Sequence, residues 1–262
     1  MKKVLDHLQC TQDDIAPIVL MPSNPAKADR IAGFLDNAKN VGRYREFVSW
    51  TGTYNTIPVS VISTGVGCPS TAIAVEEAIL GGAQILIRVG TCGGSWRDDI
   101  PCGSLILPTA CVREEGTTSE YVPTTFPAVA DFSVMSALAR VASTMDIQVF
   151  TGINRTHDAY YGSGISRERW THSFESCDVP LPTQPILSSE MECSALYLLA
   201  ALRGVKAGAV LSVNADPEAL CVQKQSNVIP AMKSNKVTAD YAEEYSIELV
   251  LQSLPDLKML IE

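Results

Sequence analysis

The sequence has little that would point to a metalloprotein, a secreted protein or a membrane protein. Its eight cysteines include no C-x-x-C pair, and its three histidines, His7, His157 and His172, have no zinc-type spacing. Two lysines near the start are not followed by an apolar leader run, and no apolar segment is long enough to span a bilayer. We therefore expect free thiols, no bound metal, no membrane contact and a cytoplasmic location.

Positive charge is also scarce. The chain carries 20 Lys and Arg against 29 Asp and Glu, a formal net charge of −9. Surfaces that bind nucleic acid or anionic lipid need clustered positive charge, so we expect neither as a partner. No internal repeat or low-complexity tract is present, and 262 residues can bury a sizeable core in one large α/β domain or two smaller ones.

Apolar segments of two kinds alternate along the chain. Strand-like runs cover residues 17–21, 46–54, 58–63, 84–89, 104–110, 148–153 and 207–213. Helical periodicity covers residues 69–80, 132–145, 190–202 and 238–253. This alternation predicts an α/β sheet with helices on its faces, and such sheets bind ligands at the carboxyl ends of their strands.

One arginine interrupts an otherwise apolar run. Arg88 lies near the end of the stretch "AQILIRVGTCGG", just before a turn that contains Thr91. A buried guanidinium without a partner is strongly destabilising, so an anion is expected beside it. A phosphate or a substrate carboxylate fits the bidentate arginine fork, and a structural ion pair with one of the chain's own carboxylates is the alternative.

Two other segments combine turns with charge or with exposed backbone. "STGVGCPSTAIAVEEA" is a strand, a glycine loop and a helix that starts near Pro69, which suits either an anion at the helix N-terminus or a tight turn. It matches neither the G-x-G-x-x-G fingerprint nor a P-loop. "YREF" places Arg45 and Glu46 in an edge-like strand, where taken alone they are a solvated charge pair.

The segment "SSEMECSALYLLAALRG" opens an apolar helix that Ser188 or Ser189 could cap. A glutamate near a helix N-terminus suits the helix dipole, which is a structural explanation for one carboxylate. Two of them, Glu190 and Glu192 around Met191, suggest that one faces a hydroxyl-rich ligand such as a sugar.

Two further segments hold candidates for base recognition and proton transfer. In "DAYYGSG", Tyr160 or Tyr161 could stack on a flat base, or the segment could be a plain turn. "LSVNADPEA" ends a buried strand with Asn214 and Asp216. An acid there is a candidate proton donor if its pocket raises its pKa, or a turn residue before Pro217.

Together, in order, these segments resemble the nucleoside phosphorylase family of uridine phosphorylases and hexameric purine nucleoside phosphorylases. The matching elements are "DHL", "YREF", "STGVGCPSTAIAVEE", "IRVGTCGG", "FPAVADF", "SSEMECSA" and "VNADP", which cover nearly the whole chain. The resemblance implies a single α/β domain over residues 1–262, a mixed central sheet with a distorted barrel flanked by helices. It also implies a homodimer or a trimer of dimers with shared active sites.

The family cleaves the N-glycosidic bond of a nucleoside with inorganic phosphate as co-substrate and without a cofactor, giving free base and a pentose 1-phosphate. By resemblance the phosphate ligands are Ser23, Lys27, Arg45 from a neighbouring subunit, Arg88 and Thr91. The ribose ligands are His7 from across the interface, Met191 and Glu192. The base-binding residues are Cys92, Gly93, Tyr160, Glu190, Asn214 and Asp216, with Asp216 and Arg88 as the catalytic residues.

The base-recognition stretch departs from the uridine enzymes. They carry a Gln-x-Arg pair shortly after the aromatic pair, whereas "YYGSGISRERW" has Gly164 and Ser166 at about those positions. Asp216 matches the acid of the purine enzymes, so a purine nucleoside is the expected substrate. The alternative is a uridine phosphorylase with an atypical loop, in which Arg167 or Arg169 takes the uracil role.

The phosphate loop departs as well. The family motif is Gly-Asp-Pro-x-Arg, and here "SNPAK" supplies Ser23 and Lys27, a point charge in place of the arginine fork. A non-catalytic nucleoside-binding relative is therefore a further hypothesis. A hydrolytic relative would lack the phosphate arginines, and Arg45 and Arg88 argue against it. Residues 217–236 are polar without periodicity, which suggests a mobile lid.

Overall fold

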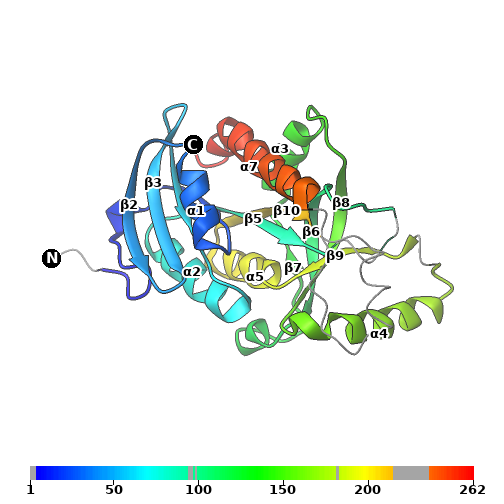
Figure 1. The fold of residues 1–262 in the computed structure, drawn as a ribbon. Helices are drawn as coiled ribbons and strands as arrows, with labels where there is room; N and C mark the ends of the chain where they lie inside the picture. The colour runs from blue at the N-terminus through cyan, green and yellow to red at the C-terminus, as the bar shows by residue number, and fades with distance from the viewer. Residues whose placement is uncertain (1–3, 94–96, 98, 181–182, 215–235) are drawn as a thin grey trace.

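Strands and helices alternate along the chain in the computed structural model (Figure 1), as the sequence predicts. The structure describes residues 4–93, 97, 99–180, 183–214 and 236–262. The strands are β1 (Ile18–Met21), β2 (Asp36–Tyr44), β3 (Phe47–Tyr54), β4 (Ile57–Ile62), β5 (Ile85–Cys92), β6 (Leu105–Glu114), β7 (Ala128–Val129), β8 (Val149–His157), β9 (Ile186–Glu190) and β10 (Lys206–Val213). The α-helices are α1 (Pro25–Ala32), α2 (Cys68–Leu80), α3 (Phe132–Ala142), α4 (Ser163–Glu175), α5 (Cys193–Arg203) and α7 (Lys236–Lys258), with 3-10 turns at Gln12–Asp14, Thr117–Glu120 and Tyr160–Gly162.

The described strands form one mixed sheet in the order β2-β3-β4-β1-β5-β10-β6-β8-β9, with β7 paired to β6. The central strands β4, β1, β5 and β10 are parallel, and β10 meets β6 in antiparallel register. All four residues of β1 are buried, as expected of a strand covered on both faces. The predicted mixed α/β sheet is confirmed.

The sheet curls until its far end meets its centre. Gly93, directly after β5, exchanges two backbone hydrogen bonds with Ser189 of β9, at 3.0 and 3.1 Å. The strands β5, β10, β6, β8 and β9 thereby close on one another. This is the distorted barrel that the sequence resemblance implies.

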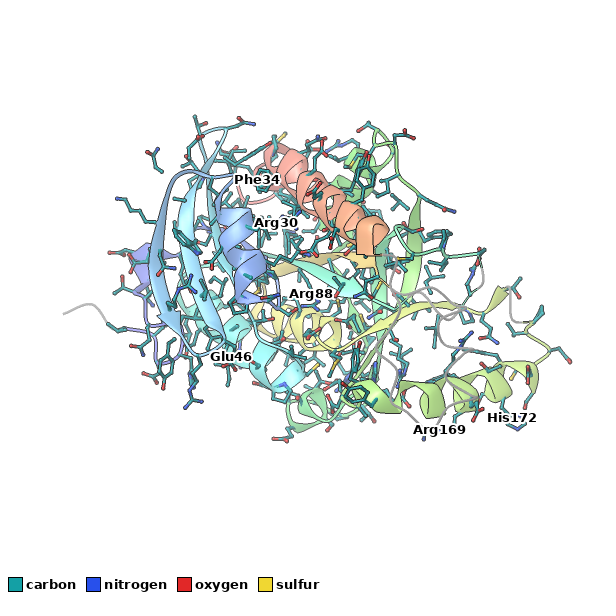
Figure 2. All side chains as sticks on the ribbon, in the orientation of Figure 1. Arg30, Phe34, Glu46, Arg88, Arg169 and His172 are labelled. Atoms are coloured by element: carbon teal, nitrogen blue, oxygen red, sulfur yellow. The ribbon has the colours of Figure 1, made fainter. Side chains whose placement is uncertain are left out.

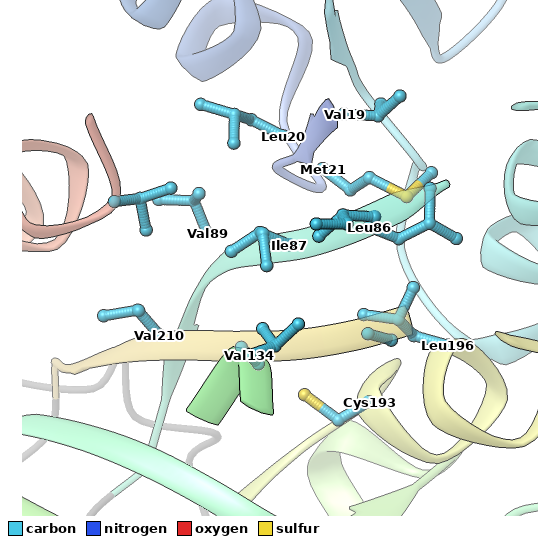
Figure 3. Close-up of a cluster of buried hydrophobic side chains, with 14 of the residues drawn as sticks. Val19, Leu20, Met21, Leu86, Ile87, Val89, Val134, Cys193, Leu196 and Val210 are labelled. Atoms are coloured by element: carbon cyan, nitrogen blue, oxygen red, sulfur yellow. The ribbon is translucent and has the colours of Figure 1, made fainter. Parts of the chain in front are cut away.

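Helices cover both sides of the central strands. In Figure 1, α2 and α5 lie below them and pack on each other, while α3 and α7 lie above and also pack on each other. The core between these layers is apolar and fully buried. Figure 3 shows part of it, with side chains from β1, β5, β10, α3 and α5: Val19, Leu20, Met21, Leu86, Ile87, Val89, Val210, Val134, Cys193 and Leu196.

One predicted helix begins later than expected. Residues 190–202 are predicted as a helix, but Glu190 completes β9 and α5 begins at Cys193. The prediction that Ser188 or Ser189 caps this helix is also wrong. The Glu190 carboxylate caps it, because its Oε2 accepts hydrogen bonds from the backbone N–H groups of Glu192 and Cys193 at 2.8 and 2.9 Å.

The sequence analysis misses four elements near the site, β2, β9, α1 and α4, and places one pair of residues wrongly. Arg45 and Glu46 are not within a strand but form the turn between β2 and β3, with Arg45 at φ 53°. The edge strand β2 is mostly exposed and lacks apolar alternation, so its sequence reads as loop. The helices α1 and α4 lie in segments for which the sequence analysis predicted only loops.

Candidate active site

Three loops meet at one edge of the sheet. β1 pairs in parallel with both β4 and β5, so the carboxyl ends of the three strands lie together. The loops are joined by backbone hydrogen bonds, from Thr64 N to Pro22 O at 2.9 Å and from Gly65 N to Ser23 O at 3.1 Å. Thr91 stands at the end of the third strand. This is the crevice position in which α/β sheets bind ligands.

A pocket of about 470 Å³ opens at this edge. It is lined by Ser23, Asn24, Pro25, Lys27, Glu46, Gly65, Val66, Val89, Gly90, Thr91 and Glu243. The structure thus brings together three of the five predicted phosphate ligands, namely Ser23, Lys27 and Thr91. The other two, Arg45 and Arg88, are not among its lining residues.

Lys27 reaches the pocket from α1. That helix starts with Pro25 in its first turn and with the Asn24 side chain accepting a hydrogen bond from Ala26 N at 2.9 Å. The Lys27 side chain is 6% exposed, and its Nζ lies 3.4 Å from Glu243 Oε1. Among the described residues Nζ has no hydrogen-bond partner, and burial lowers the pKa of Lys27 to about 8. A buried ammonium with free donors therefore stands at the pocket wall.

Arg88 is buried, and its anions are carboxylates of the chain itself. Its Nη2 donates to Glu192 Oε2, and its Nε lies 3.2 Å from Glu190 Oε2. Figure 2 shows Arg88 in the interior, away from Arg169 and His172 on α4. Burial opposes the charge, but the two glutamates outweigh it and raise the pKa of Arg88. The ion-pair alternative thus describes this structure, and phosphate binding by Arg88 stays a prediction.

Glu190 is held entirely by internal contacts. Its Oε1 accepts from Asn154 Nδ2 at 2.9 Å and from Thr156 Oγ1 at 2.7 Å, and its Oε2 caps α5 and faces Arg88. Nearly every lone-pair direction of the carboxylate is occupied. The structure therefore places Glu190 as a connector between β8, β9, α5 and β5, and its predicted part in base binding stays a prediction.

Glu192 occupies the junction between the glycine loop and α5. Its Oε1 accepts from Gly67 N at 2.8 Å, and its Oε2 accepts from Arg88 and from Met191 N at 3.2 Å. Burial raises the pKa of Glu192, while Arg88 opposes that rise. The carboxylate thus joins the loop that lines the pocket to the buried arginine, where a sugar hydroxyl could compete for it.

His7 and Arg45, the two residues predicted to act across a subunit interface, lie apart from the pocket lining. His7 Nδ1 is 2.7 Å from Glu77 Oε1, and the Glu77 carboxylate also accepts from the backbone N–H of His7 and of Leu8. The Arg45 guanidinium lies over the Tyr44 ring, 5.3 Å from its centroid. Both side chains are engaged by contacts within the chain, and their part in a neighbour's site stays a prediction.

Four of the predicted base-binding residues, Cys92, Gly93, Glu190 and Asn214, lie at or directly after the ends of β5, β9 and β10. Cys92 is buried and its thiol pKa is raised by burial, while Asn214 N donates to Cys92 O at 3.1 Å. Gly93 forms the bridge to β9. Tyr160 is half exposed and makes an edge contact with Tyr161, the ring centroids being 5.1 Å apart. Asp216, predicted as the acid, lies outside the described residues, as do residues 217–235 of the predicted lid.

A partly buried charge network that the sequence analysis did not identify contacts α4. Glu114 of β6 accepts hydrogen bonds from Arg155 Nε of β8 and from Trp170 Nε1 of α4, the latter at 3.1 Å. Arg169 Nη2 lies 3.3 Å from the same carboxylate. Arg169, one candidate for the uracil role, is therefore engaged with Glu114.

The pocket also contains two carboxylates that the site prediction omitted. Glu46 accepts from Ser70 Oγ at 2.8 Å, and a backbone hydrogen bond together with this hydroxyl holds its pKa below the usual range. Glu243 comes from α7, where nothing in the local sequence distinguishes it from Glu244.

No group of three or more His, Cys, Asp or Glu among the described residues could hold a metal ion. None of the helices in that part of the chain is sufficiently long and apolar to cross a membrane.

Gly65 fixes the glycine loop against the pocket. Its φ is +72°, and a Cβ there would lie 2.4 Å from Ser70 Oγ and 2.6 Å from Glu46 Cγ. We expect Gly65→Ala to lower the free energy of unfolding by about 2–4 kcal/mol, because strain and steric overlap add. Gly82→Ala is the matched control, since Gly82 has φ +106° with nothing within 4 Å. Urea unfolding of both variants measures the difference, and equal losses would mean that the loop relaxes freely.

The comparisons with known proteins agree with this geometry. The sequence matches the model of the phosphorylase superfamily over residues 17–253. It is similar to uridine phosphorylase from Treponema pallidum, at 40% identity over 79% of this chain and 80% of that protein. It is also similar to uridine phosphorylase from Thermococcus kodakarensis, at 36% identity over 91% of this chain and 88% of that protein.

A solved structure shows the same fold. Purine nucleoside phosphorylase from Toxoplasma gondii, in complex with immucillin-H, superposes with a TM-score of 0.83 at 26% identity, covering 99% of this chain and 98% of that one. The similarity thus extends over essentially the whole chain.

Proposed function

The chain belongs to the phosphorylase superfamily and is a nucleoside phosphorylase, a pentosyltransferase; from this premise we propose that it cleaves uridine with inorganic phosphate. The observation that carries the phosphate site is the pocket where β1, β4 and β5 end, with the buried Lys27 ammonium in its wall. Uridine is supported by the similarity to two uridine phosphorylases, which outweighs the missing Gln-x-Arg pair.

In the proposed reaction a phosphate oxygen bonds to C1′ of the ribose while the N-glycosidic bond breaks. The electron pair of that bond leaves with the base, which takes up a proton, and the sugar is oxocarbenium-like in the transition state. Phosphate held by Lys27, Thr91 and Ser23 supplies both the nucleophile and nearby negative charge. Glu192 orients the ribose hydroxyls. Arg88 supplies the positive charge that the Glu190 and Glu192 carboxylates require.

A purine nucleoside is the second candidate substrate. Asp216 matches the acid of purine enzymes, and the fold is also that of a purine nucleoside phosphorylase. A carboxylic acid near N7 of the purine would protonate the leaving base. The preference for a purine nucleoside, predicted from the sequence, therefore stays a prediction, and uridine is the substrate that we propose.

We extend the proposal to assembly and to the co-substrate. The chain forms at least a homodimer in which Arg45 and His7 complete a neighbour's site, and it uses phosphate without a further cofactor. Both residues are exposed or half-exposed and lie outside the pocket lining of their own chain. Activity per chain should therefore fall on dilution, together with the mass seen by light scattering.

Base release from uridine, inosine and adenosine, each with and without inorganic phosphate, tests the proposal. We expect uracil release that requires phosphate and exceeds release from either purine nucleoside by at least about tenfold, a difference near 1.4 kcal/mol. Release chiefly from inosine would support Asp216 as the acid and overturn uridine. Release without phosphate would indicate a hydrolase, and binding without release would indicate the non-catalytic relative.

A further inference from the structure

The pocket assigned to phosphate carries more negative than positive charge. Among its described lining residues the charged side chains are Lys27, Glu46 and Glu243. The Arg88 guanidinium lies behind Gly90, where a Cβ would come within 2.8 Å of Arg88 Nε, and its charge is balanced by Glu190 and Glu192. A phosphate dianion entering this pocket therefore meets one ammonium and two carboxylates.

The two carboxylates have different roles. Glu46 is bonded to Ser70 and lies in the turn between β2 and β3. Glu243, on α7, is 23% exposed, and its Oε1 lies 3.4 Å from Lys27 Nζ and 3.9 Å from Arg30 Nη1. Among the described residues it is the counter-anion of Lys27.

We propose that Glu243 sets the affinity of the pocket for phosphate: its carboxylate is an internal anion that phosphate displaces from Lys27. This inference rests on the proposed function, in which Lys27 binds phosphate. Because the carboxylate and the phosphate compete for one ammonium, Glu243 weakens phosphate binding and sets the phosphate concentration that the enzyme needs.

The pH dependence follows from the groups that face Lys27. These are Glu243 from α7, Arg30 from α1 and Arg88 from β5, with Glu46 at the same pocket. Burial lowers the pKa of Lys27 to about 8, and Glu243 opposes that shift. Lys27 thus holds phosphate below about pH 8 and loses its charge above it. Without Glu243 the pKa of Lys27 falls further, so the charge is lost at a lower pH.

The test compares Glu243→Gln with two controls in the full-length protein. Glu243→Asp keeps the charge, and Glu244→Gln removes a neighbouring charge that pairs with Arg30 at 2.8 Å outside the pocket lining. At about pH 6.5 we expect Glu243→Gln to lower the KM for phosphate about fivefold, as removal of one competing ion pair would. The Kd of inorganic phosphate from calorimetry should fall equally, and this gain should shrink as the pH rises toward 8. Glu244→Gln should stay within about twofold of the wild type, and Glu243→Asp, whose shorter side chain withdraws the carboxylate from Lys27, should lie between the wild type and Glu243→Gln.

The outcomes separate this inference from the proposed function. Phosphate-dependent cleavage with an unchanged or higher KM in Glu243→Gln would overturn the inference and leave the function standing. Tighter phosphate binding without phosphate-dependent cleavage would overturn the function and support the role of Glu243. An equal gain in Glu244→Gln would show that freeing Arg30, and not Lys27, attracts the anion, and would also overturn the inference.

Discussion

Replacing Arg88 with methionine is expected to lower the free energy of unfolding by about 3–5 kcal/mol and to abolish phosphorolysis. Methionine fills much of the volume, but it leaves the buried carboxylates of Glu190 and Glu192 without their cation. Urea unfolding followed by circular dichroism measures the first effect, and the uridine assay with phosphate measures the second.

The loss of stability in this variant should depend on pH. Burial already raises the pKa of Glu192, and Arg88 opposes that rise, so the variant raises it further. A carboxyl whose pKa is higher in the folded chain than the ~4.3 of an unfolded one loses stability as the pH rises between the two values. The penalty should therefore be smallest at about pH 4, near the unfolded pKa, and grow toward neutral pH.

Arg203→Met is the matched control for Arg88→Met. Arg203 makes a bidentate pair with Glu76 at 2.9 and 2.7 Å, but its side chain is 45% exposed. We expect a loss of at most about 1 kcal/mol without the same pH dependence, because exposed ion pairs contribute little. Similar losses in the two variants would contradict the account of Arg88 as a buried charge that two carboxylates require.

The second large effect is a difference between the two glutamates of the "EME" segment when each is replaced by glutamine. Glu190→Gln is expected to lower the free energy of unfolding by about 2–4 kcal/mol, because its amide would place a donor against the donors of Asn154, Thr156 or the start of α5. Glu192→Gln should lose somewhat less, about 1–3 kcal/mol. Its amide also meets donors, those of Gly67, Met191 and Arg88, but burial already disfavours the charged form of Glu192.

Activity should show the reverse order. We expect Glu192→Gln to lower kcat/KM for uridine at least about a hundredfold, the size seen when one transition-state hydrogen bond is removed. Glu190→Gln should lower it less when both variants are assayed under conditions where they are folded. A larger rise in the nucleoside KM for Glu190→Gln than for Glu192→Gln would instead support the predicted place of Glu190 in base binding.

Sequence patterns predicted the centre of this fold because they are local there. Buried parallel strands have continuous apolar runs, so β1, β4, β5 and β10 could be located, and their shared carboxyl edge implied the site. The buried position of Arg88 followed from the same runs. The partners of Arg88 could not be predicted in the same way. Several anions could pair with one guanidinium, and only the folded chain brings Glu190 and Glu192 to it.

The elements that were missed depend on distant contacts. β2 is polar and exposed, and its strand conformation comes from pairing with β3. Glu190 was assigned to a helix because its sequence continues into α5, whereas its strand conformation comes from pairing with β8. Glu243 lies far from Lys27 in the sequence. The acidic residues of α7 look like those of any solvent-exposed helix, so the sequence does not indicate that Glu243 lines the pocket.

The place of β10 in the sheet has a consequence for synthesis on the ribosome. β10 lies between β5 and β6, although it is the last of the described strands to be made. Until Val213 has left the exit tunnel, the nascent chain presents β5 and β6 as two unpaired edges, and unpaired edges invite association with other chains. The half of the sheet that holds Arg88 and the half that holds its glutamates therefore gain the strand between them, β10, only after both halves have been made.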